Sequence, residues 1–196
     1  MGQTSDRIRE AALTRFASKG YEAASLAEIA ADVGIKKPSI YAHFAGKEAL
    51  FRSLVELSVR EEVDFAEKQM LAEKDAQGAL KHYLEATLPR HRESPHLRFW
   101  LRATYLPPAD LLEDVTRSVF FYGAQLQRIV DELLARMDAE GRLRLDRKTL
   151  NAAYMGILRS IHADLLYQGQ DDTRKTLDAL WSVFELAAFM RPEHLN

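Results

Sequence analysis

The chain has 196 residues, of which 47% are hydrophobic and 29% charged, and its formal net charge at pH 7 is -2. This length fits one large domain or two modest ones, and this composition can bury a stable core. The absence of cysteine excludes disulfides and thiolate metal sites. The chain opens without a secretion signal, and no apolar run approaches the ~20 residues of a membrane span. We therefore expect a cytoplasmic protein with no membrane partner.

Apolar residues recur at helical spacing along the whole chain, and alternating β-branched runs between tight turns are absent. The sequence therefore predicts an all-α protein of about nine helices. In the first of them, Ile8, Ala12 and Phe16 follow one another at intervals of four residues, which predicts a helix over about 4–19. Gly20 is its expected C-terminal stop.

The second helix has the clearest N-terminal signal in the sequence, because Ser25 and Glu28 have the spacing of a capping box. Four apolar residues then recur at i, i+3, i+4 and i+7 and predict a buried stripe, namely Leu26, Ile29, Ala30 and Val33. Gly34 ends this helix, since glycine enters a left-handed turn at little cost.

A short third helix is predicted around Pro38, which suits a first helical turn, with Ile40 and Phe44 facing inward. A long fourth helix begins near Lys47, after the break at Gly46. Further helices are predicted near 75–93, 96–105, 110–138, 147–168 and 173–190.

A helix, a short glycine turn and a second brief helix together form the geometry that places a recognition helix in the major groove of DNA. Residues 34–47 carry Lys36, Lys37, His43 and Lys47 and no acidic residue. Such a local basic patch can attract phosphates although the whole chain is slightly acidic. These features predict a DNA-binding module.

Residues 5–55 resemble the DNA-binding region of the TetR family of bacterial repressors. The shared motifs are Phe16-Ala-x-Lys-Gly-Tyr21, Ser25-Leu-x-x-Ile-Ala-x-x-Val-Gly34, Ser39-Ile-Tyr-x-His-Phe44 and Lys47-Glu-x-Leu50. The sequence departs from the family pattern at Ala42, where many relatives have a larger and often aromatic residue.

The resemblance implies a role for each matching position. Lys37, Pro38 and Ser39 open the recognition helix, where family members touch bases. A second group of positions usually holds backbone phosphates, namely Ser25, Tyr41, His43 and Lys47. With Lys36 of the basic patch, the predicted DNA-contact set is Ser25, Lys36, Lys37, Pro38, Ser39, Tyr41, His43 and Lys47.

We expect residues 1–46 to form the helix-turn-helix DNA-binding domain and 47–196 a helical effector-binding and dimerisation domain. The last two helices are apolar on two sides, and a helix with two apolar sides has two partners. The resemblance also implies a homodimer formed by these helices, although a monomer with a deep core is the alternative. The predicted interface residues are Met155, Leu177, Trp181, Phe184 and Ala188. A second apolar stripe on the last helix comprises Val183, Leu186 and Phe189.

A small-molecule effector is expected to bind between the DNA-binding module and the interface helices. The candidate residues combine aromatic surfaces with a few polar groups, as small-molecule pockets do, although aromatic residues at helical spacing are also typical of a core. They are Phe99, Trp100, Arg102, Tyr105, Phe121, Tyr122, Gln125, Tyr154, Arg159 and His162.

The sequence contains no catalytic motif, phosphate-binding loop or dinucleotide fingerprint, so we expect neither an enzyme nor a cofactor or metal. The predicted function is that of a ligand-responsive regulator, a repressor that binds a palindromic operator in double-stranded DNA as a homodimer and is released by an effector. Two alternatives remain open at this point, a ligand-independent architectural DNA binder and a protein-interaction bundle.

Overall fold

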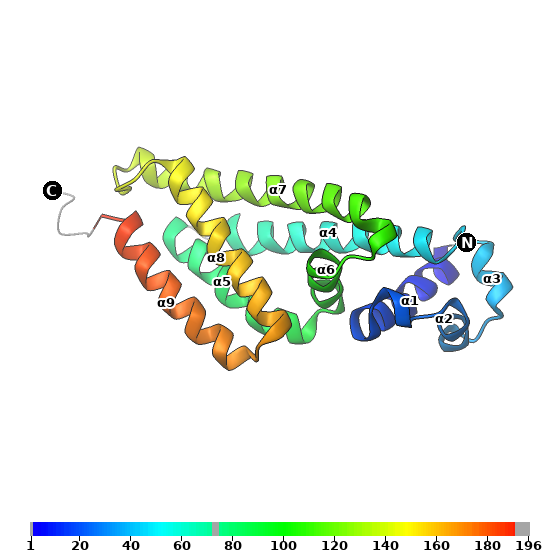
Figure 1. The fold of residues 1–196 in the computed structure, drawn as a ribbon. Coiled ribbons are helices and arrows are strands. Elements are labelled where there is room, and N and C mark those ends of the chain that lie inside the picture. Colours follow the sequence, from blue (N-terminus) through cyan, green and yellow to red (C-terminus); the bar gives the residue numbers. More distant parts are fainter. Residues whose placement is uncertain (1, 72–74, 191–196) are drawn as a thin grey trace. The chain divides into compact units, whose positions relative to one another are not determined.

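The computed structural model describes residues 2–71 and 75–190. Across these residues the chain forms nine α-helices, one short 3-10 helix (η1) and no strand (Figure 1). The elements are α1 (Gly2–Ala23), α2 (Leu26–Val33), α3 (Lys37–Tyr41), α4 (Lys47–Leu71), α5 (Ala76–Glu93), α6 (Pro95–Tyr105), η1 (Ala109–Leu111), α7 (Leu112–Ala139), α8 (Arg147–Tyr167) and α9 (Gln170–Ala188). The all-α prediction is confirmed. No helix of the described ranges is long and apolar enough to cross a bilayer.

Two glycines end helices where the sequence predicted. Gly20 has φ 82° and ψ 172°, which breaks the helical path of α1 near its C-terminal end. Gly34 has φ 74° and ψ 31°, and its N–H donates to the carbonyls of Ala30 and Ala31. Both positions lie in the region of positive φ that favours glycine, so these two residues determine where the chain turns before and after α2.

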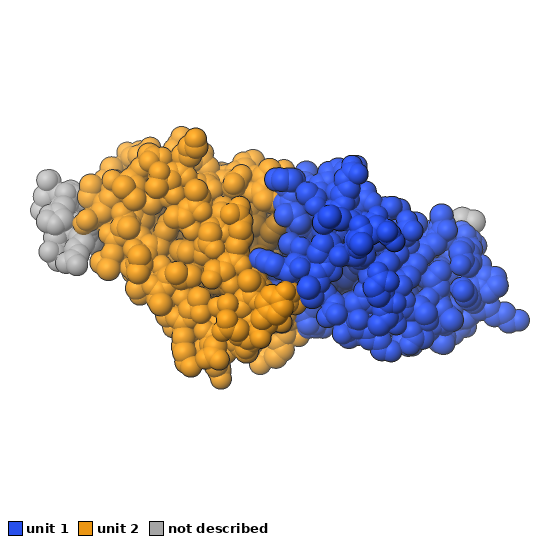
Figure 2. Space-filling model, viewed as in Figure 1, with its two compact units in different colours: residues 1–62, 93–121 blue, residues 63–92, 122–196 orange. Residues whose placement is uncertain are grey.

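The chain packs as two compact units, shown in different colours in Figure 2. Unit 1 comprises residues up to 62 together with 93–121, and unit 2 comprises 63–92 together with the residues from 122 onward. Unit 1 therefore includes residues 47–62 of α4, all of α6 and the start of α7, in addition to the three helices of the expected DNA-binding domain. The functional boundary at residue 46 stays a prediction, because the two units are defined by packing alone.

The core of unit 1 contains a cluster of four aromatic rings from α1, α4 and α6. The rings of Phe16 and Phe51 meet edge to face with centroids 5.5 Å apart, and those of Phe51 and Phe99 do so at 5.1 Å. Tyr21 joins the cluster at 5.1 Å from Phe51. These separations and angles are favourable for aromatic pairs, so the cluster fixes α1 against α4 and α6.

The core of unit 2 is built by the end of α4, α5, the later part of α7, α8 and α9. Tyr154 is fully buried and donates a hydrogen bond of 2.8 Å to the carbonyl of Leu80. The hydroxyls of Tyr83 and Tyr122 lie 3.2 Å apart, which satisfies two further buried polar groups. On α9, the rings of Trp181 and Phe184 pack with centroids 5.5 Å apart. One face of α9 is thus buried against its own unit.

Candidate nucleic-acid interface

The start of α2 is fixed by a complete capping box. The backbone N–H of Glu28 donates to Oγ of Ser25 at 3.2 Å, and the backbone N–H of Ser25 donates to Oε2 of Glu28 at 3.1 Å. At the other end, Arg7 donates to the carbonyl of Val33 at 2.7 Å. Both ends of this short helix therefore have partners for their free backbone groups, which holds α2 in place as a support for α3.

The turn after α2 orients α3 so that its polar side faces outward. The N–H of Ile35 donates to the carbonyl of Ala30 at 2.9 Å, which closes the turn. Lys36 stands at the N-cap, and Pro38 lies in the first turn, where the sequence predicted it. Ile40 is fully buried and Phe44 is nearly so. These two apolar residues anchor α3 and its C-terminal flank and leave the other side chains to solvent.

The predicted DNA contacts all have at least part of their surface accessible in unit 1. Six of them are exposed, namely Ser25, Lys36, Lys37, Pro38, Ser39 and Tyr41. His43 and Lys47 are half-buried. Ala42 is exposed among them and offers only a methyl group, which can contact a thymine methyl but cannot read a base by hydrogen bonding. The accessible positions on α3 and at its N-cap therefore supply two lysines, a serine and a phenol.

Lys47 is held at the start of α4 by the C-terminal end of α1, after the break at Gly20. Its Nζ lies 4.2 Å from the centroid of the Tyr21 ring and donates to the carbonyl of Glu22 at 3.4 Å. A lysine at a helix N-terminus is unfavourable for the helix dipole. The contacts with Tyr21 and Glu22 offset this cost and direct the ammonium group of Lys47.

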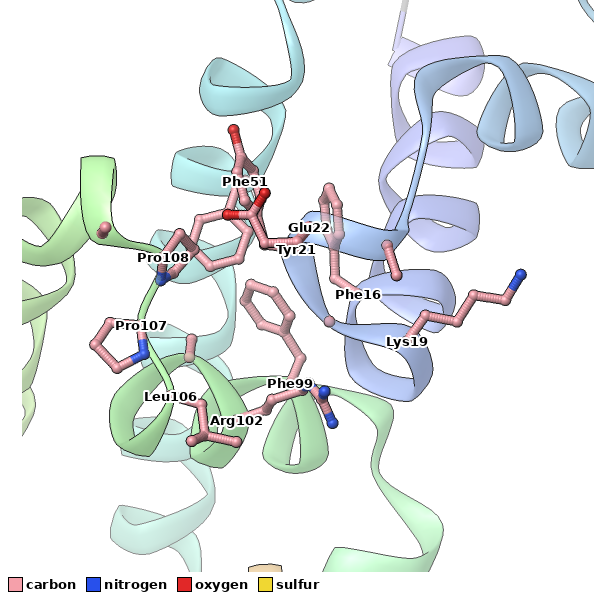
Figure 3. Close-up of a pocket in the computed structure, with 14 residues that line it drawn as sticks. Phe16, Lys19, Tyr21, Glu22, Phe51, Phe99, Arg102, Leu106, Pro107 and Pro108 are labelled. Carbon is pink, nitrogen blue, oxygen red and sulfur yellow. The ribbon is translucent and has the colours of Figure 1, made fainter.

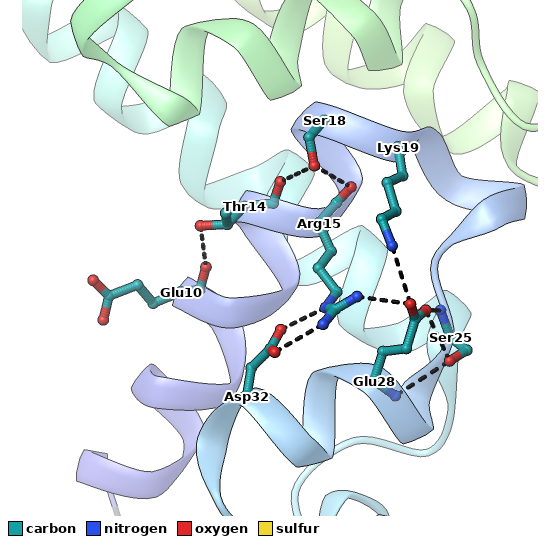
Figure 4. Close-up of polar contacts among 8 residues, drawn as sticks. All are labelled: Glu10, Thr14, Arg15, Ser18, Lys19, Ser25, Glu28 and Asp32. Atoms are coloured by element: carbon teal, nitrogen blue, oxygen red, sulfur yellow. Dashed lines mark hydrogen bonds and ion pairs between the residues drawn. The ribbon is translucent and has the colours of Figure 1, made fainter.

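An ion-pair cluster between α1 and α2 neutralises the two acidic residues of α2 (Figure 4). Arg15 donates to Oδ1 of Asp32 at 2.8 Å and to Oε1 of Glu28 at 2.8 Å. Lys19 reaches the same Glu28 oxygen at 3.1 Å. Because both carboxylates of α2 are paired with cations of α1, they oppose the attraction between phosphates and α3 less than free acids would.

The lowered pKa of Glu28 leads to a testable prediction about how the stability of the protein depends on pH. Hydrogen bonds from Lys19 and then Ser25 lower the pKa of Glu28 to about 2 from its ordinary value of 4.5. A carboxyl whose pKa is lowered by folding stabilises the protein above its unfolded pKa and loses that contribution as the pH falls through its folded pKa. We expect Glu28→Gln to have a lower melting temperature than wild type at pH 7. The difference should narrow as the pH falls from about 4.5 toward 2.

Thermal unfolding followed by circular dichroism across this pH range checks the expectation. The difference in melting temperature should be small, because Glu28 and its cationic partners lie at the surface, where solvent screens their attraction. Asp178→Asn, which alters an exposed carboxyl on α9, serves as the control for a change of charge alone. A melting difference for Glu28→Gln that stays constant from pH 7 to pH 3 would contradict the assignment.

Residues 8–54 match the family described as bacterial regulatory proteins, tetR family. Over 60 residues the chain is 40% identical to the biofilm operon icaADBC HTH-type negative transcriptional regulator IcaR of Staphylococcus epidermidis. This stretch covers 31% of the chain and 32% of that regulator, so the chain spans about a third of the relative's length. Both findings show that the N-terminal region of the chain is similar to the DNA-binding region of the tetR family.

Two longer similarities extend beyond the N-terminal region. The HTH-type transcriptional repressor ComR of Escherichia coli is 28% identical over 142 residues, which cover 70% of this chain and 67% of ComR. A solved structure of a putative TetR-family transcriptional regulator from Mesorhizobium loti superposes with a TM-score of 0.75 at 20% identity, over 96% of this chain and 98% of that one. The latter likeness shows that the chain has the fold of TetR-family proteins over nearly its whole length.

The ten predicted effector-binding residues are divided between the two units. In unit 1, Phe99 and Arg102 line a pocket of about 360 Å³, shown in Figure 3. Their neighbour Trp100 is buried in the core, Tyr105 is half-buried, and Phe121 is 55% exposed. The structure thus places two of these five at a described pocket.

In unit 2, Tyr122 and Tyr154 are buried and use their hydroxyls within the core. Gln125 is half-buried and Arg159 is exposed. His162 is 5% exposed, and its Nε2 has no hydrogen-bond partner in the described part of the chain. Burial, with a smaller effect of His91, lowers the pKa of His162 to about 4, so the ring is neutral at pH 7. The effector-binding role of these residues stays a prediction.

The five predicted interface residues are buried within unit 2. Met155, Leu177, Trp181, Phe184 and Ala188 are each at most 5% exposed. They belong to the intrachain core, so they cannot also offer a free surface to a second copy. The large exposed apolar residues of α9 are instead Val183 and Leu186, at 68% and 63%. On α8, the exposed positions include the small residues Ala152, Ala153 and Gly156.

The pocket wall also contains three aromatic residues that were not among the predicted effector contacts, namely Phe16, Tyr21 and Phe51. Phe16 and Tyr21 belong to the family motif, and Phe51 lies in the apolar pattern of the fourth helix. No local pattern in the sequence indicated that α6 would pack beside them.

Proposed function

We propose that this chain is a transcriptional repressor that binds a palindromic operator as a homodimer and is released from it by a small-molecule effector. The observation that carries the proposal is the exposed basic side of α3, held by a doubly capped α2 and a buried Ile40. Two such modules related by a two-fold axis can occupy successive major grooves of a palindrome. Of the regulators similar in sequence, IcaR is described as a negative transcriptional regulator and ComR as a transcriptional repressor.

Bases are read by the first turn of α3 in this proposal. Lys37 and Ser39 are exposed there and can donate to base edges, and Lys37 can bind guanine. The phosphates are held from outside α3, by Lys47 at the start of α4 and by Ser25 at the start of α2. A contact from Ser25 requires an exchange of partners, because its hydroxyl lies 3.1 Å from Oε2 of Glu28.

The homodimer is proposed to form through the outward side of α8 and α9. The small side chains of Ala152, Ala153 and Gly156 let a second helix approach closely. Val183 and Leu186 supply the apolar contact beside them. Four helices, two from each copy, would then pack about a two-fold axis. This surface replaces the buried residues that the sequence had suggested.

Substitution of two lysines distinguishes base reading from phosphate holding. Lys47→Ala should weaken binding to all DNA sequences about equally, because a phosphate contact carries no sequence information. It should also reduce the slope of log affinity against log salt by about 2 per dimer, since each phosphate contact releases about one counterion. Lys37→Ala should change which operator variants are preferred, with a cost of about 1–3 kcal/mol at the base that it reads.

Fluorescence anisotropy with DNA from upstream of the protein's own gene, and with single-base variants of it, provides the measurement. Lys68→Ala is the matched control, since this lysine lies in the last turn of α4. The assignment fails if Lys47→Ala changes sequence preference while Lys37→Ala does not. A complex that no cell extract dissociates would favour the ligand-independent architectural role, and the absence of any complex would favour an interaction bundle.

A further inference from the structure

The pocket of unit 1 lies between α1, the start of α4 and the end of α6, and it has the composition of a ligand site. Its volume of about 360 Å³ is at the lower end of the ~300–1,000 Å³ typical of small-molecule pockets. The rings of Phe16, Phe51 and Phe99 form much of its wall, with Leu106 beside them (Figure 3). Space of this size and lining suits a flat aromatic body of one or two rings.

One cation is available to a ligand in this pocket. Of the two cations in the wall, Lys19 extends away from the hollow and pairs with Glu28. Arg102 extends from α6 toward α1, and it makes no hydrogen bond or ion pair to any residue that the structure describes (Figure 3). A half-buried guanidinium with five donors and no partner is suited to bind a carboxylate.

The close approach of Arg102 depends on Gly20. A Cβ atom at this glycine would lie 2.9 Å from both Nε and Nη2 of Arg102. Glycine therefore has two functions here, since it allows the positive φ that breaks α1 and leaves room for the guanidinium beside the backbone. The sequence and the fold together bring an unpaired positive charge to the edge of an aromatic pocket.

A carboxylate also lines the pocket and limits the charge of the ligand. Glu22 is exposed in the wall, next to Tyr21. A second anionic group on the ligand would be repelled by Glu22, whereas a single one can lie beside Arg102. We propose that this pocket binds an aromatic monocarboxylate, with its ring system among Phe16, Phe51 and Phe99 and its carboxylate on Arg102.

This site deepens the proposed function and rests on it where regulation is concerned. Tyr21 and Glu22 line the pocket, and the same two residues contact Lys47. Ala23 also lines it and lies two residues before Ser25, the N-cap of α2. A ligand that displaces this segment would move both proposed phosphate contacts. An effector can lower DNA affinity only in this way, by binding the DNA-incompetent arrangement more tightly.

The test uses 1-naphthylacetate and its neutral amide, 1-naphthylacetamide, as probes of the full-length protein without DNA. Ligand-observed NMR titrations give both dissociation constants. We expect the wild type to bind the carboxylate at least about tenfold more tightly than the amide, as a charge-assisted hydrogen bond requires. Arg102→Gln should abolish this preference, and Arg102→Lys should keep part of it. Arg60→Gln, which removes an exposed arginine of α4 that is not in the pocket wall, should bind like wild type.

Three results would overturn the proposal: no binding of either probe by the wild type, equal binding of acid and amide by the wild type, or an unchanged preference in folded Arg102→Gln. The comparison of acid with amide needs no substitution, so it decides the matter even where a variant fails to fold. DNA affinity is measured separately, without probe. Wild type that binds the carboxylate but no DNA would contradict the proposed function alone, and wild type that binds DNA but neither probe would contradict the ligand site alone.

Discussion

Phe16→Ala is expected to lower the free energy of unfolding by about 3–5 kcal/mol, the usual cost of removing a buried aromatic ring. Phe16 is 1% exposed and its ring contacts those of Tyr21, Phe51 and Phe99. Its loss leaves a cavity and removes three aromatic pairs at once. Urea unfolding followed by far-UV circular dichroism measures the effect. A loss of this size is a large part of the stability of a typical domain.

Phe121→Ala is the matched control, because this phenylalanine is 55% exposed at the end of unit 1. We expect its unfolding free energy to lie within about 0.5 kcal/mol of wild type. A cost below about 1 kcal/mol for Phe16→Ala would mean that the aromatic cluster does not hold α1 against α4 and α6. The description of unit 1 would then be wrong in its central feature.

The sequence predicted the helices well because their ends carry local signals. The capping box of Ser25 and Glu28 and the left-handed turn at Gly34 depend on residues within a few positions of one another. The start of α4 at Lys47 follows directly from the break at Gly46. Such signals act on neighbouring residues, so they can be recognised without knowledge of the tertiary structure.

The unit 1 pocket could not be predicted, because it depends on residues far apart in sequence. Phe16 meets Phe99 across more than eighty positions, with ring centroids 6.3 Å apart. Helical periodicity shows that each of these residues faces an apolar environment but not which helix supplies it. The sequence therefore indicated Phe99 and Arg102 as candidate ligand contacts without their partners from α1.

The choice between the two apolar stripes of α9 could not be made from the sequence for a related reason. Trp181 and Phe184 are large, and large aromatic residues are common at interfaces. The same property makes them suitable for an intrachain core, where the structure places them. Periodicity indicates that a helix has two apolar sides but does not indicate which of them its own domain covers. Val183 and Leu186, which are smaller than Trp181 and Phe184, are the residues that the structure leaves exposed.

The double substitution Val183→Glu and Leu186→Glu should convert the protein to a monomer while leaving its fold intact. Both side chains are mostly exposed in a single chain, so charge there costs the isolated subunit little. In the proposed interface, four glutamates from two copies would be buried near one another without counter-charges, at a cost of several kcal/mol. Sedimentation velocity should show a monomer, and circular dichroism should show an unchanged helical content.

Operator affinity of this double variant should fall by about two orders of magnitude or more, because each monomer then binds one half-site without the effective concentration that the dimer provides. Leu145→Glu, at an exposed leucine outside α8 and α9, is the control and should remain dimeric and bind DNA normally. Trp181→Glu should behave differently from both, because a charge at a position only 3% exposed destabilises the fold itself.

A double variant that remains a tight dimer would show that the copies meet through another surface. A monomeric double variant with undiminished operator affinity would show that one recognition helix is sufficient, and the role of the dimer in DNA binding would then be wrong.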